Sequence, residues 1–69
     1  MIRMVVLVID ENNKIRKFQG IEQAEKYMSR HKGTYFMVEL LGKYLGVSVV
    51  ESENGEVIQK KGLTISRSD

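Results

Sequence analysis

The 69-residue chain contains no cysteine and only one histidine. Without cysteine it can form no disulfide, and one histidine with scattered carboxylates is a poor set of metal ligands. We therefore expect neither a metal nor another cofactor, and the missing cysteines fit a reducing cytoplasm. A chain of this size hides only about 60% of the surface that it exposes when unfolded. Packing, or a partner subunit, must supply its stability.

The chain also has no long hydrophobic run and no large excess of one charge. The apolar stretch 4–9 is shorter than a signal-peptide core and far below the roughly 20 residues of a membrane span, so it predicts a strand and no membrane association. Eleven lysines and arginines against nine acids give a net charge of +2, which by itself does not indicate a nucleic-acid ligand. The balance of 42% hydrophobic and 29% charged residues is typical of a folded protein. We expect one compact domain over residues 1–66 and a frayed tail at 67–69.

Hydrophobic patterning predicts an α+β fold with the element order strand, strand, helix, strand, strand, strand. The sheet should be small and antiparallel or mixed, with five strands, or six if residues 63–65 form a short strand of their own. One helix, at about 21–32, should cover one face of this sheet. The strands are expected at 4–9, 14–18, 34–41, 44–52 and 57–61.

The predicted helix rests on apolar residues spaced three and four apart, with glycines on both sides. Glu22 in the first turn and Arg30 in the last turn suit the helix dipole, and Gly33 can take the left-handed conformation that ends helices. The residues on one helical face are Ile21, Ala24, Tyr27, Met28 and His31.

Asn54-Gly55 is the strongest hairpin signal in the chain, because both residues tolerate the positive φ angles of a type I′ turn. It would also place Glu53 opposite Glu56, a like-charge pair that mildly disfavours this register and leaves a longer loop open. The pairs predicted for a two-residue loop are Glu51 with Ile58, Val49 with Lys60, Val50 with Gln59 and Ser52 with Val57.

The first and third predicted strands are apolar on both sides, which one helix of about 12 residues, roughly 18 Å long, cannot cover. A homodimer or another protein partner should therefore shield the second face, unless the sheet curls into a partly closed barrel. Tyrosine and methionine are favoured at protein interfaces. We place the interface candidates on the face opposite the helix: Tyr35, Met37, Leu41 and Tyr44.

Residues capable of catalysis have simpler structural roles in this sequence. His31 lies in the last turn of the helix, where a positive imidazole complements the carbonyl end, and no local motif would complete a triad. Asp10 and Glu11 precede two asparagines and predict a polar turn with side-chain bonds to the local backbone. We therefore expect no enzyme.

Clustered basic residues provide an alternative function, binding of nucleic acid. Two of these clusters, brought together by folding, would form a phosphate-binding surface on which neighbouring tyrosines could stack bases. On a presumed edge strand, however, basic residues also block aggregation. The candidates are Lys14, Arg16, Lys17, Arg30 and Lys32.

The segments 18–28 and 31–35 together resemble short proteins of Gram-positive bacteria and their phages, in which a strand leads into a helix with an acidic start and then a tyrosine-rich strand. The resemblance covers under half of the chain and implies no activity and no site residues. From its sequence we expect a non-catalytic protein-protein interaction module, homodimeric or modulating a larger protein.

Overall fold

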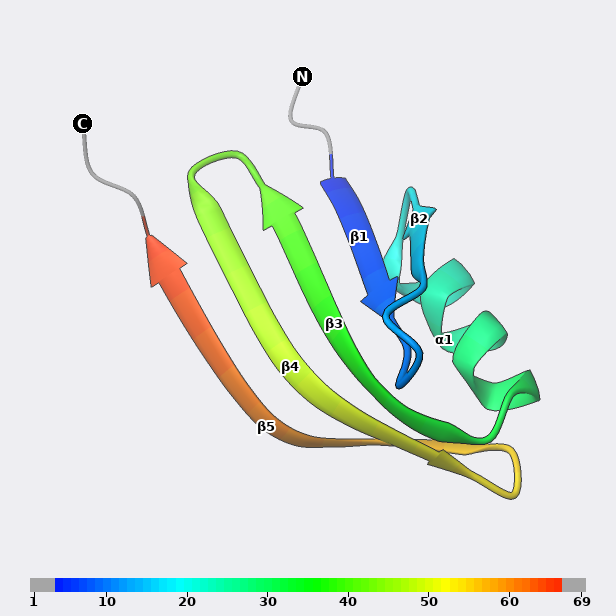
Figure 1. The fold of residues 1–69 in the computed structure, drawn as a ribbon. Helices are drawn as coiled ribbons and strands as arrows, with labels where there is room; N and C mark the ends of the chain where they lie inside the picture. Colours follow the sequence, from blue (N-terminus) through cyan, green and yellow to red (C-terminus); the bar gives the residue numbers. More distant parts are fainter. Residues whose placement is uncertain (1–3, 67–69) are drawn as a thin grey trace.

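The computed structural model describes residues 4–66, and it confirms the α+β class and the predicted order of elements (Figure 1). The predicted tail at 67–69 and the first three residues of the predicted domain lie outside the described residues. Residues 63–65 continue the last strand, so the described sheet has five strands and no sixth. The elements are β1 (Met4–Ile9), β2 (Ile15–Phe18), α1 (Ile21–Arg30), β3 (Gly33–Leu41), β4 (Tyr44–Glu53) and β5 (Glu56–Ser66).

The sheet is antiparallel throughout, with strand order β2-β1-β3-β4-β5, so β3 is the central strand. Three neighbouring pairs are hairpins, and the fourth, β1 with β3, is joined through β2 and α1. This connection places α1 on one face of the sheet, against β1, β2, β4 and β5 (Figure 1). Within residues 4–66 no helix has the length and apolar character needed to cross a bilayer.

Helix α1 starts after Gly20 and is two residues shorter than predicted. Gly20 occupies the N-cap in an extended conformation and makes no side-chain cap bond, as expected for a residue without a side chain. The helix ends at Arg30 because His31 is extended and its backbone N–H donates to the Met28 carbonyl. Gly33 has a φ of 154° and begins β3, so the prediction that it ends the helix in the left-handed conformation is wrong.

The hydrophobic core lies between α1 and the sheet. Ala24 and Met28 are fully buried, and the Ser52 hydroxyl of β4 donates a buried hydrogen bond to the Met28 carbonyl. This bond joins the end of the helix to the sheet. The buried core residues from the strands are Val6, Val8, Tyr35, Met37 and Val50.

The Asn54-Gly55 hairpin forms as predicted, with φ angles of 54° and 81° and with Glu53 opposite Glu56. One predicted pair is wrong: Val49 faces Lys61 and not Lys60, because a β-bulge lies opposite Val49 and Val50. The extra residue bends the strand, as bulges do. Figure 1 shows β3, β4 and β5 curving toward α1 along this part of the sheet.

Candidate functional site

Two of the four predicted interface residues lie under the helix. Tyr35 and Met37 are only 4% and 5% exposed and belong to the core that packs on α1. Their predicted position on the face opposite the helix is therefore wrong. Alternation along β3 correctly indicated that they share a face, but both faces of β3 are apolar, so alternation could not indicate which face α1 covers.

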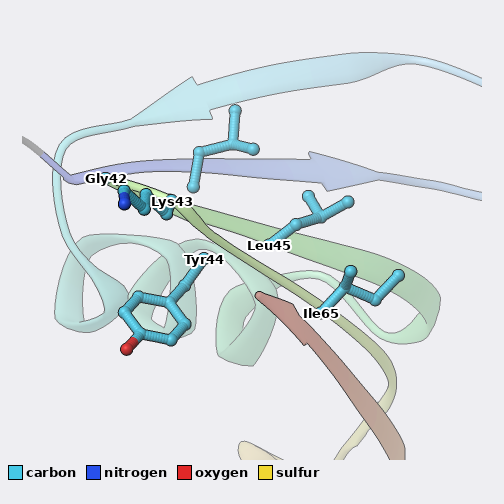
Figure 2. A pocket seen from close by; sticks show the side chains of 6 residues that line it. Gly42, Lys43, Tyr44, Leu45 and Ile65 are labelled. Atoms are coloured by element: carbon cyan, nitrogen blue, oxygen red, sulfur yellow. The ribbon is translucent and has the colours of Figure 1, made fainter. Parts of the chain in front are cut away.

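The other two predicted interface residues are exposed but also lie on the α1 side of the sheet. Leu41 pairs with Tyr44 across the β3–β4 hairpin, and both follow the alternation of Met37. Tyr44 is 55% exposed. Figure 2 shows its ring pointing away from Leu45 and Ile65, whose side chains lie together on the other side. The predicted set is thus divided between the core and the rim of the covered face.

The face opposite α1 carries three rows of side chains that run across the sheet, and we call these rows the open face. Residues that pair directly across antiparallel strands project to the same side, so the strand register defines each row. The first row is Val5, Leu40, Leu45 and Ile65; the second is Lys17, Leu7, Val38, Val47 and Leu63; the third is Ile15, Ile9, Phe36, Val49 and Lys61.

No residue of the open face is buried, although nearly all are apolar. Phe36 on the central strand is 53% exposed, and Leu63 on β5 is 62% exposed. Strands lie about 4.8 Å apart and rows about 6.8 Å apart, so the three rows of the open face cover roughly 500 Å² when the curvature of the sheet is ignored. Contiguous apolar patches above about 400 Å² are uncommon on monomers unless they bind something.

Charge lies only at the margins of the open face. Lys17 occupies the β2 end of the middle row, and Lys61 occupies the β5 end of the third row. Beyond the third row, Lys60 lies 3.4 Å from Glu51, in an ion pair that is half exposed and contributes little stability. An apolar centre with a charged rim is the usual composition of a protein interface.

A shallow hollow marks the first row of the open face, next to the β3–β4 hairpin (Figure 2). Leu40, Leu45 and Ile65 line it, together with the hairpin residues, and its volume is about 230 Å³. Typical small-molecule pockets are larger and carry convergent polar groups. The hollow suits an inserted aliphatic side chain better than a polar substrate.

A second candidate, a polar cleft, lies where the β1–β2 turn meets the end of α1. Asp10, Glu11, Tyr27, His31 and Tyr35 line it with their neighbours. The Tyr27 ring lies 4.5 Å from the His31 ring and 6.4 Å from the Tyr35 ring, centroid to centroid. These residue types could carry acid-base chemistry if their polar atoms were free.

Several of these polar atoms form structural hydrogen bonds instead. The Asp10 carboxylate accepts the backbone N–H groups of Asn12 and Lys14 at 2.9 and 3.0 Å, which confirms the predicted polar turn. The Tyr35 hydroxyl donates to the His31 carbonyl, and burial raises the pKa of this hydroxyl above the ordinary 10.0. The Glu11 carboxylate also accepts the Thr34 backbone N–H at 3.0 Å, so these bonds tie the turn and the end of α1 to β3.

The strand register places one of the predicted nucleic-acid residues, Lys17, on the opposite face from its neighbour Arg16. Arg16 pairs with Val8 and shares its α1 side, where its Nε donates to the Tyr27 hydroxyl at 2.8 Å. Lys17 projects to the open face instead. Lys14 directly precedes β2, whereas Arg30 is the last residue of α1 and Lys32 follows it by two residues. Alternation on β2 therefore separates the two basic residues that the sequence places side by side.

Comparison with protein-family models, curated proteins and solved structures found no match to this chain. The resemblance of segments 18–28 and 31–35 to short proteins of Gram-positive bacteria and their phages therefore stays a prediction. Among residues 4–66, no group of three or more histidine, aspartate or glutamate side chains is arranged to hold a metal ion.

Proposed function

We propose that this protein is a non-catalytic protein-binding module that acts in the cytoplasm through its open face. The supporting observation is the continuous apolar surface across five strands, which nothing in residues 4–66 covers. The absence of cysteine favours the cytoplasmic assignment. This proposal keeps the predicted interaction role but moves it from Tyr35 and Met37 to the neighbouring residues Phe36 and Val38.

The test compares two substitutions that introduce the same charge at exposed positions. Phe36→Asp places a carboxylate in the open face, whereas Leu41→Asp places one on the α1 side. The wild-type protein should associate in sedimentation at micromolar concentration or bind a hydrophobic dye. Phe36→Asp should abolish whichever of these is observed, and Leu41→Asp should leave it unchanged. A wild-type protein that is strictly monomeric and binds no dye would contradict the proposal.

A further inference from the structure

We infer that the occupant of the open face is a second copy of this chain, packed face to face about a two-fold axis along β3. The inference rests on the proposed function and specifies the partner. Val38 lies at the centre of the open face, because β3 is the middle strand of five and Val38 is in the middle row. A two-fold axis through the centre of this surface passes Val38 in both copies.

The positions of the two lysines select the direction of the axis. An axis along β3 keeps each row but reverses the strand order, so Lys17 faces Leu63 of the second copy and Lys61 faces Ile15. Each lysine stem then lies over an aliphatic side chain while its ammonium group extends to the rim. An axis across the strands instead places Lys17 against Lys17, and opposed like charges disfavour association.

The size and chemistry of the open face also fit a second sheet. Its central residues, from β1, β3 and β4, are all apolar and offer no side-chain donor or acceptor for a polar partner. Two sheets packed face to face lie about 10 Å apart with interdigitated aliphatic side chains. Two copies would bury at least roughly 1,000 Å², near the lower limit for specific interfaces, so we expect a reversible dimer.

The cysteine-free sequence permits a direct test, since one introduced cysteine is the only thiol in the chain. Val38→Cys should cross-link to itself with a short thiol-reactive reagent. The control Glu25→Cys, exposed on α1, should give only background cross-linking. A mixture of Lys17→Cys and Leu63→Cys chains should yield more cross-linked dimer than either variant alone. Circular dichroism confirms that each variant is folded.

The outcomes separate this inference from the proposed function. The inference of a second copy is contradicted if the wild-type protein is monomeric and Val38→Cys cross-links no more than Glu25→Cys. If that monomer still binds a hydrophobic dye in a manner that Phe36→Asp abolishes, the protein-binding face stands and its partner is a different protein. A wild-type monomer that binds no dye overturns both proposals. Preferential cross-linking of Lys17→Cys to itself overturns the axis along β3.

Discussion

At the scale of single residues, polar groups join α1 to the sheet at the same end of the helix. The Met28 carbonyl accepts the Ser52 hydroxyl from β4 and also the His31 backbone N–H. Tyr35 donates its hydroxyl to the carbonyl of His31, the residue that follows the helix. Carbonyls at the end of a helix lack partners within the helix, so these two side chains add hydrogen bonds where the helix itself supplies few.

We predict that Ser52→Ala lowers the free energy of unfolding by about 1 kcal/mol, the typical value of one buried hydrogen bond. The loss should not be larger, because the Met28 carbonyl keeps the His31 N–H as a donor. Ser29→Ala is the matched control: its hydroxyl bonds the Lys26 carbonyl at an exposed position, so removal should cost almost nothing. Urea unfolding of both variants measures the difference. Equal losses of unfolding free energy in the two variants would show that the hydrogen bond from β4 to α1 adds no stability beyond that of an exposed hydroxyl.

Tyr35 should make stability depend on pH in the alkaline range. Burial raises the pKa of its hydroxyl above 10.0 in the folded state, so the unfolded chain releases this proton first. The contribution of the Tyr35 hydroxyl to the free energy of unfolding is complete below its ordinary pKa. It is lost as the pH rises through the pKa of the folded state. The stability advantage of wild type over Tyr35→Phe should therefore shrink with increasing pH in this range. Urea unfolding at a series of pH values tests this, and a constant difference would contradict it.

The residue scale also shows the limit of inference from sequence. Alternation correctly separated Tyr35 and Met37 from Phe36 and Val38. It could not assign the helix to one of the two sets, because each supplies apolar side chains. The helix-covered face depends on the path from β2 through α1 into β3, which is a property of three elements together. A protein interface was therefore predicted, but all four of its named residues lie on the α1 side and not on the face opposite the helix.

At the scale of elements, the β4–β5 hairpin shows that a turn determines the register of nearby pairs but not of distant ones. The turn Asn54-Gly55 fixes the pairs nearest to it, and Glu51 opposite Ile58 was predicted correctly. The bulge then shifts the register by one residue, so Val49 meets Lys61. No local signal marks the extra residue: Lys60 and Lys61 are identical in type, and either could occupy the paired position. The curvature of the sheet was therefore outside what the sequence could indicate.

We predict that Gly55→Ala destabilises the protein by about 1–2 kcal/mol, because a side chain at a φ of 81° is strained whatever space surrounds it. Asn54→Gly is the control, since glycine also adopts the left-handed conformation that this turn requires. It should cost much less. Thermal unfolding compares the two, and an unchanged midpoint for Gly55→Ala would show that the turn relaxes to another type.

At the scale of the whole molecule, the sheet has one covered and one open face, and the dimer that we propose would couple stability to association. A ligand that binds only the folded state raises the apparent stability with the logarithm of its concentration. We therefore predict that the thermal midpoint of the wild-type protein rises with protein concentration. Phe36→Asp should remove this dependence. Scanning calorimetry over a wide dilution series measures it, and a concentration-independent midpoint for wild type would argue against self-association.

The separation of Lys17 from Arg16 leads to a prediction for the nucleic-acid alternative. A protein that neutralises several phosphates loses affinity steeply between about 50 and 200 mM salt. We expect no such salt-dependent binding of a labelled DNA or RNA oligonucleotide, measured by fluorescence anisotropy. Tight binding that falls with salt and disappears when Arg16 and Lys32 are neutralised together would revive that function.

Strand β5 forms one edge of the sheet and pairs, within residues 4–66, with β4 alone. Eleven residues of edge backbone are a template for uncontrolled fibril growth. The bulge beside Lys60 interrupts this template, since an incoming strand cannot match its spacing on both sides of the irregularity. The same bulge that bends the sheet therefore disfavours edge-to-edge polymerisation through β5. It leaves the open face accessible.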